Sequence, residues 1–156
     1  MPVEMPEPPS VWPRGAPSVG QRAERTRVIG NQDIEVFTAI SGDHNPLHYD
    51  AERSRKTLFG GIVVQGGVTS AILNAVVAED LPGPGTVFLH VSWDFKAPVR
   101  PGDTITGQVE VTKVRHDKPI TELSTRVVRG DGTIVLEGRA VCYTVALGSE
   151  IATPRS

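Results

Sequence analysis

Residues Gly66 to Glu79 read GGVTSAILNAVVAE, and this segment constrains the architecture of the chain more than any other. Apolar side chains recur there at helical spacing: Val68, Ala71, Ile72, Ala75 and Val76. Most of the remaining positions are small, and a helix that is apolar on nearly all sides is a buried helix. At about 1.5 Å per residue, the segment predicts a central helix about 21 Å long. The prolines and glycines of residues 81–85, LPGPG, end it.

The segments after this helix alternate apolar and polar residues, which is typical of β-strands. The expected strands span about Val87–Phe95, Thr104–Val111, Ile120–Arg129 and Thr133–Val145. Because short turns join them, they predict an antiparallel meander. One buried helix against one antiparallel sheet is an α+β architecture. We expect the uncovered part of such a sheet to contact a partner subunit.

Two further elements are predicted ahead of the central helix. Residues Gln21–Ile29 have the pattern of a short or edge strand. Residues 31–40 begin with capping side chains and continue with apolar residues at helical spacing, which predicts an amphipathic helix that ends at Ser41–Gly42. Residues 43–61 are rich in turn residues, so we expect a loop there with at most one helical turn.

Both ends of the chain lie outside this pattern. Residues 1–18 are rich in proline, which fits neither a helix interior nor a central strand, so we expect an extended and poorly ordered arm. Alternatively, Val11 and Trp12 could anchor this arm across the surface. Residues 148–156 are expected to form a flexible tail. A single domain is therefore predicted over residues 19–147.

Composition excludes several classes of protein. The chain has 156 residues with 16 Lys and Arg against 18 Asp and Glu, so it lacks the basic excess of a nucleic-acid-binding protein. Its single cysteine, Cys142, cannot form an internal disulfide bond. No apolar run is long enough to span a bilayer, and the first residues do not resemble a secretory signal. We therefore expect a cytoplasmic protein that binds neither nucleic acid nor membrane.

The densest polar cluster is Ser41–Asp50, SGDHNPLHYD. Asn45 suits an N-cap and Pro46 suits the first position of a helix, so a short helical turn is predicted. His48 would then lie at the positive end of the helix dipole, which disfavours an imidazolium. Asp43 lies across the turn from it. A carboxylate and a neutral imidazole that face one cavity can act as a general acid–base pair.

Two other interpretations of this cluster stay open from the residues alone. Asp43 could simply cap backbone amides, since Asp, Asn and Pro are common turn residues. The side chains of Asp43, His44, His48 and Asp50 are also of types that bind metal ions. However, the two histidines flank Pro46 and cannot share a regular helix face. No metal site is therefore predicted.

The second candidate site is Gln65-Gly66-Gly67, at the start of the central helix. The first turn of a helix has free N–H groups, and glycine lets a ligand carbonyl approach them closely. An N–H aimed at a thioester oxygen would stabilise a developing enolate, as an oxyanion hole does. Alternatively, the glycines simply let the chain enter the helix beneath a crowded sheet.

The stretch Asp43-His44-Asn45-Pro46-Leu47-His48, D-x-N-P-L-H, resembles the signature of the MaoC-like dehydratases and (R)-specific enoyl-CoA hydratases. The resemblance covers about residues 20–145, including FGGIVVQGGVTSAIL before and in the central helix and the HDKP turn. It implies a hot-dog fold, in which an antiparallel sheet wraps a long central helix. It also implies a homodimer or higher homo-oligomer with an acyl-thioester tunnel at the subunit interface.

The resemblance also implies roles for single residues. Asp43 and His48 match the catalytic pair of the family, and Gly66 matches the residue whose N–H holds the thioester carbonyl. Asn45 matches a supporting residue. Where the family commonly has His-Gly-Met, this chain has Gln65-Gly66-Gly67. We expect Gln65 and Gly67 to contact substrate still, with a change in acyl chain-length preference more than in the reaction.

The implied reaction is the reversible addition of water to a trans-2-enoyl thioester, which gives an (R)-3-hydroxyacyl thioester without metal or redox cofactor. An alternative within the enzymes is dehydration of 3-hydroxyacyl groups on an acyl carrier protein. An alternative of a different class is an acyl-thioester-binding subunit without activity, which the presence of both Asp43 and His48 disfavours. A thioesterase is disfavoured because nothing beyond the fold indicates hydrolysis.

Overall fold

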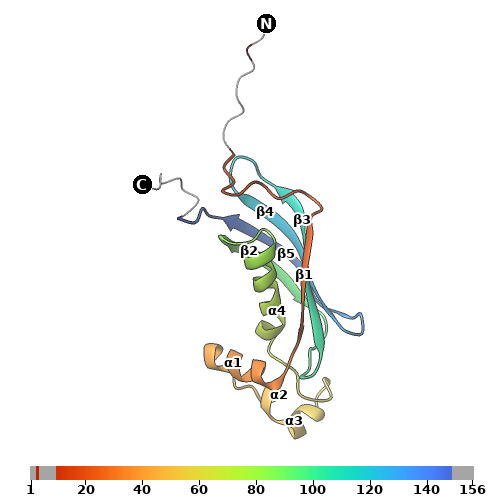
Figure 1. Cartoon of the computed structure of the whole chain (residues 1–156). Helices are drawn as coiled ribbons and strands as arrows, with labels where there is room; N and C mark the ends of the chain where they lie inside the picture. Colours follow the sequence, from red (N-terminus) through yellow and green to blue (C-terminus); the bar gives the residue numbers. More distant parts are fainter. Residues whose placement is uncertain (1–2, 4–9, 149–156) are drawn as a thin grey trace.

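The computed structural model describes residue 3 and residues 10–148 (Figure 1). The rest of the predicted arm and tail, residues 1–2, 4–9 and 149–156, lies outside the described residues. In chain order the elements are β1 (Arg22–Val28), α1 (Asn31–Ser41), α2 (Pro46–Tyr49), α3 (Ala51–Arg55), α4 (Gly66–Ala75), the π-helical turn η1 (Val76–Asp80), β2 (Thr86–Phe95), β3 (Thr104–Val114), β4 (Ile120–Arg129) and β5 (Ile134–Thr144). They all lie within the range predicted for the domain.

The strands form one antiparallel sheet in the order β1-β3-β4-β5-β2, and α4 lies against one face of it (Figure 1). Apolar side chains of α4 and η1 meet those of the strands in a single core. Leu73 and Val76 are completely buried there, as are Ile105 and Leu123 on the facing strands. The predicted α+β architecture, with a central helix wrapped by an antiparallel sheet, is confirmed.

The close approach of α4 to the sheet depends on Gly107 in β3. A Cβ atom at this position would lie 2.7 Å from Cγ2 of Ile72, which is shorter than any tolerable contact. The missing side chain therefore lets the helix settle on the strand. At Val76 the helix changes to π-type hydrogen bonding, and Leu81 N–H donates to Val76 O at 2.9 Å. The apolar pattern did not predict this widened turn.

The predicted meander is correct for β3, β4 and β5 but wrong for β2. That strand pairs with β5, with Trp93 opposite Gly138, and so lies at the edge of the sheet. The segment between β2 and β3 is not a tight turn, because Val99 within it is buried and its carbonyl accepts a hydrogen bond from Val64 N at 2.8 Å. Turn residues mark where a strand ends; they do not determine which strand it pairs with.

The helix predicted to end at Ser41–Gly42 is confirmed, and Gly42 adopts the left-handed conformation at φ +76° that suits a helix C-cap. The prediction of at most one helical turn in residues 43–61 is wrong. Two short helices form there, because Asp50 ends α2 and also caps α3, accepting a hydrogen bond from Arg53 N at 3.0 Å. A residue typical of turns can therefore begin a helix.

The proline-rich arm contacts the domain at Trp12. The indole is buried, and its Nε1–H donates to the carbonyl of Arg115 at 2.9 Å. This is the anchored arrangement, which the sequence left as the alternative for this arm. Burial of a large aromatic side chain stabilises the folded state when its N–H also finds a hydrogen-bond acceptor. Val11 remains exposed beside it.

Candidate active site

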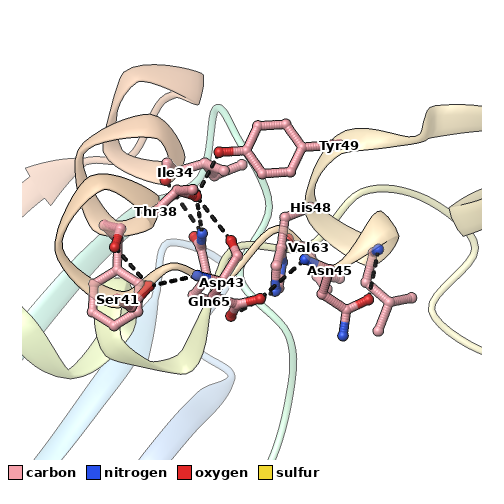
Figure 2. A network of polar contacts seen from close by, with 11 residues as sticks. Ile34, Thr38, Ser41, Asp43, Asn45, His48, Tyr49, Val63 and Gln65 are labelled. Atoms are coloured by element: carbon pink, nitrogen blue, oxygen red, sulfur yellow. Dashed lines mark hydrogen bonds and ion pairs between the residues drawn. The ribbon is translucent and has the colours of Figure 1, made fainter.

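The carboxylate of Asp43, in the loop between α1 and α2, faces the imidazole of His48 in α2 (Figure 2). Asp43 Oδ2 lies 3.4 Å from His48 Nε2. The other oxygen, Oδ1, accepts a hydrogen bond from Asn45 N at 3.1 Å. The backbone-capping interpretation of Asp43 is therefore correct for one oxygen, while the other oxygen faces the histidine. The backbone cap fixes the direction in which Oδ2 points.

Asn45 caps α2 as predicted, because its side-chain oxygen accepts from Leu47 N at 3.1 Å. This cap turns the chain so that His48 comes back over Asp43. The imidazole is held from its other side by Val63, whose carbonyl oxygen lies 2.6 Å from Nδ1. A carbonyl can only accept a hydrogen bond, so Nδ1 carries a proton. In the neutral ring, the lone pair of Nε2 is then directed toward Asp43.

His48 does not lie clearly at the positive end of a helix. The helix dipole was expected to keep the ring uncharged because the residue would lie near the positive end of a helix. The helix α2 is a single turn, so His48 lies in its last turn as well as its first. The potentials of the free N–H groups at one end and of the free C=O groups at the other then offset each other, so this turn supports no helix-dipole argument.

The two glycines at the start of α4 differ in their surroundings. Gly66 is exposed, and a Cβ atom there would lie 3.0 Å from Cε1 of Phe95. At Gly67 a Cβ atom would lie 2.0 Å from Cζ of Phe37, a position that the ring already occupies. Packing therefore accounts for Gly67, although the crowding comes from Phe37 of α1 and not, as the structural interpretation had it, from the sheet. Gly66 leaves its backbone N–H, which has no acceptor within the helix, open to a ligand.

Gly66 lines an open cavity of about 500 Å³ beside the ends of β2 and α4. Its wall is mostly apolar and carries two cationic residues, Lys96 and Arg100. The other lining residues are Leu58, Phe59, Val63, Val64, Thr69, Phe95, Ala97, Pro98 and Val99. Asp43, His48 and Gly66, to which the resemblance gives roles in one reaction, do not line one pocket within a single chain. The acid–base pair lies outside this lining. Val63 connects the two, since it lines the cavity and its carbonyl oxygen contacts His48 Nδ1.

The side chain of Gln65 does not point at a ligand site. It is buried, and Nε2 donates to Ile34 O at 3.2 Å and to Thr38 Oγ1 at 3.0 Å. The sequence reasoning missed Thr38, and it also missed Tyr49, which donates to the same hydroxyl. One signal could have identified Thr38: it lies one helical turn after Ile34, on the buried face of α1.

The described residues, 3 and 10–148, contain no group of three or more His, Cys, Asp or Glu side chains placed to hold a metal ion. Nor does that part of the chain contain a helix long and apolar enough to cross a membrane.

Cys142 is buried in β5, where loss of solvation raises the pKa of its thiol to about 12. A thiol that stays protonated is a poor nucleophile.

Comparison with known proteins identifies the family. Residues 15–131 match the model described as the MaoC like domain, which is most of the chain. The chain belongs to the MaoC-like family. The predicted resemblance is therefore confirmed, and the match includes the D-x-N-P-L-H stretch and α4.

Individual relatives of this MaoC-like chain are similar over most of its length. An (R)-specific enoyl-CoA hydratase from Aeromonas caviae is 38% identical over 123 residues, which cover 79% of this chain and 92% of that protein. A mitochondrial 3-hydroxyacyl-[acyl-carrier-protein] dehydratase from Arabidopsis thaliana is 33% identical over 125 residues, which cover 78% of this chain and 74% of that protein.

A solved structure agrees with these relatives. The (R)-hydratase from A. caviae matches with a TM-score of 0.78 and 37% identity, and the match covers 82% of this chain and 97% of that one. The hot-dog fold expected from the resemblance is thus confirmed.

Proposed function

We propose that this chain is a hydro-lyase that adds water reversibly to a trans-2-enoyl thioester and forms the (R)-3-hydroxyacyl thioester. The observation that carries the proposal is the pairing of Asp43 Oδ2 with His48 Nε2 at 3.4 Å, with the ring fixed from behind by Val63. Family membership supports it, because relatives over most of the chain include an enzyme named (R)-specific enoyl-CoA hydratase.

The geometry suits activation of a water molecule. When the ring is neutral with its proton on Nδ1, both His48 Nε2 and Asp43 Oδ2 are acceptors. A water molecule between them can donate one hydrogen to each and keep a lone pair for attack. As its oxygen bonds to C3 of the substrate, Asp43 takes one proton from it. The pair then returns a proton to C2, with His48 Nε2 as the relay, so the thioester gains the elements of water.

The thioester carbonyl has a separate binding group in this proposal. Negative charge develops on its oxygen while C3 is attacked, and a fixed N–H donor stabilises that charge. We assign this donor to Gly66 N–H, at the start of α4 and on the wall of the cavity. The apolar part of that wall would receive the acyl chain. Asn45 then acts through the backbone by keeping Asp43 and His48 opposed.

We also propose that the active protein is a dimer formed through β2. Among the described residues, this strand pairs on one side only, with β5. Its apolar residues are exposed to an unusual extent: Val87 at 52%, Leu89 at 56%, Val91 at 40% and Phe95 at 57%. An unpaired apolar edge strand invites pairing with another strand. A second copy at this edge would also cover the open cavity, which Phe95 lines.

Two acyl carriers are candidates for the thioester. Relatives include enzymes named for CoA thioesters and for acyl carrier protein. Lys96 and Arg100 at the cavity can attract an anionic carrier of either kind.

The proposed location is the cytoplasm, where a single buried thiol at Cys142 stays reduced.

The proposal is tested with crotonyl-CoA and purified protein. Wild-type protein should remove the enoyl absorbance and yield the (R)-3-hydroxy product in chiral analysis. Asp43→Asn keeps an oxygen for the Asn45 backbone cap but loses the base, so its kcat should fall roughly a hundredfold to ten-thousandfold. Glu52→Gln, which removes an exposed carboxylate of α3, is the matched control and should keep the wild-type rate.

The possible outcomes separate the alternatives. A wild-type protein that binds acyl-CoA without turnover would support a binding subunit and refute the hydro-lyase. Release of free thiol would indicate a thioesterase. Much higher kcat/KM for an acyl-carrier-protein substrate than for the matching CoA ester would identify the carrier protein as the physiological handle.

A further inference from the structure

A single buried hydroxyl joins the segments that carry the proposed catalytic groups. Thr38 lies in α1, is 7% exposed, and donates from Oγ1 to the carbonyl of Asp43 at 3.0 Å. The same oxygen accepts from Gln65 Nε2 at 3.0 Å and from the hydroxyl of Tyr49. Figure 2 shows these side chains meeting at Thr38. None of these partners is closer to it in sequence than five residues.

The direction of each hydrogen bond is fixed by chemistry. Gln65 Nε2 also faces Ile34 O, and a carbonyl only accepts, so the amide cannot be turned around. Gln65 therefore donates to Thr38. The carbonyl of Asp43 likewise requires that Thr38 donates its only hydrogen there. Tyr49 must then donate to Thr38, and the hydroxyl has used its one hydrogen and both lone pairs.

Each partner stands next to a proposed functional group. Asp43 itself carries the carboxylate, Tyr49 directly follows His48 in α2, and Gln65 directly precedes Gly66. The backbone carbonyl of Thr38 also takes part in the C-cap of α1, because Gly42 N donates to it at 2.8 Å, immediately before Asp43. We propose that Thr38 is a positioning residue that fixes Asp43, His48 and Gly66 relative to one another. This inference rests on the proposed function.

The cost of burying Gln65 supports a positioning role. Its Oε1 is buried and has no hydrogen-bond partner among the described residues. A buried unpaired acceptor is unfavourable, and an apolar side chain of similar size would avoid that cost. The hydrogen bonds that Gln65 Nε2 donates explain why an amide is present here, because they connect the start of α4 to Thr38 Oγ1 and to Ile34 O.

The test compares Thr38→Val with Thr38→Ser in the hydration of crotonyl-CoA. Valine keeps the shape but removes all the bonds of the hydroxyl, so kcat should fall about tenfold to a hundredfold, as expected for slight misplacement of reacting groups. KM should stay within about threefold, because the cavity wall is unchanged. Serine retains the hydroxyl and should keep kcat within about threefold of wild type.

Thr125→Val is the matched control. Thr125 is a buried threonine of β4 whose hydroxyl accepts from Trp93 Nε1 at 2.9 Å, and it lies outside the proposed site. It should lower the melting temperature, as Thr38→Val does, yet leave kcat at the wild-type value. A loss of kcat in both variants would show that any lost buried hydrogen bond reduces activity, and would overturn the proposal.

A second variant keeps the proposal falsifiable if Thr38→Val does not fold. Tyr49 is 44% exposed, and Tyr49→Phe removes only its hydrogen bond to Thr38. It should lower kcat several-fold, and it should add little to the loss in Thr38→Val, since residues in one network act non-additively. Unchanged kcat in Tyr49→Phe, with an active wild type, overturns the positioning role alone. An inert wild type overturns the proposed function and with it this inference.

Discussion

The Nδ1 atom of His48 lies 2.6 Å from the carbonyl oxygen of Val63, fifteen positions along the chain. This contact selects the tautomer in which Nε2 is unprotonated and directed toward Asp43. We therefore predict that ¹H–¹⁵N NMR of the neutral ring shows the proton on Nδ1. A spectrum with the proton on Nε2 would remove the acceptor that the proposed water requires.

The same contact predicts the effect of His48→Asn. The side-chain amide of asparagine can donate to Val63 O in place of Nδ1, but it has no atom at the position of Nε2. Hydration of crotonyl-CoA should fall roughly a hundredfold to ten-thousandfold, while the melting temperature changes little. Circular dichroism during heating measures the second quantity. Retained activity would exclude Nε2 from the reaction.

The neighbouring glycines of α4 provide a matched pair of variants. In Gly67→Ala the new methyl group meets the ring of Phe37, so we expect a loss of about 1–3 kcal/mol in the free energy of unfolding, as overpacking typically costs. Urea titration measures it. An unchanged midpoint would show that the Phe37 ring is free to move aside.

Gly66→Ala should instead keep the stability of wild type and lower kcat. Its methyl group lies 3.0 Å from Phe95, which is 57% exposed and can yield, so stability should be close to wild type. The methyl group narrows the approach to the N–H that we assign to the thioester oxygen, and loss of such a donor costs about a hundredfold or more in kcat. Wild-type kinetics in this variant would refute the assignment.

The turn after β3 predicts a dependence of stability on pH. The hydrogen bonds from the Arg115 guanidinium lower the pKa of Asp117 to about 2. The unfolded chain has an ordinary aspartate pKa of about 3.9. Because the folded pKa is the lower one, the contribution to stability is complete above about pH 4 and disappears as the pH falls through about 2.

Asp117→Asn removes this contribution. Its melting temperature should be slightly below that of wild type at neutral pH, since both partners are exposed and solvent screens the pair. The two proteins should become equal once the pH is below about 2. A difference that persists at that pH would mean that Asp117 stabilises the turn through contacts other than its charge.

The sequence predicted best what depends on local periodicity. The apolar pattern of residues 66–79 is sufficient for a buried helix, and the alternation after it is sufficient for strands. The partner of β2 was not predictable in the same way, because β2 pairs with β5, which is distant in the sequence, and the residues that follow β2 do not specify that partner. Strand order is a property of the whole sheet.

In the candidate site too, the sequence predicted the residues that depend on local structure and missed those that depend on distant partners. The D-x-N-P-L-H stretch predicted Asp43 and His48 as a pair because an N-cap and a proline determine the turn between them. Thr38 gave only a weak signal, since its partners come from α2 and from the residue before α4. The sequence of one chain carries no signal for the pocket that Asp43, His48 and Gly66 would share, because in the proposed dimer a second chain contributes to that pocket.

The last prediction concerns that second chain. Leu89 lies in β2 with 56% of its surface exposed, on the unpaired edge of the sheet. Leu89→Lys places a charge in the proposed contact, and burial of an unpaired charge is strongly unfavourable. Light scattering should give wild type at twice the 16.7 kDa of one chain, or a higher multiple, and the variant at a lower mass.

Val28→Lys is the control, because Val28 is 65% exposed on β1, at the opposite edge of the sheet. It should keep the mass and activity of wild type. Leu89→Lys should lose activity together with mass, since its cavity next to Phe95 would stay open to solvent. A monomeric wild-type protein with full activity would show that one chain is sufficient for the reaction, and that the exposed edge of β2 has another role.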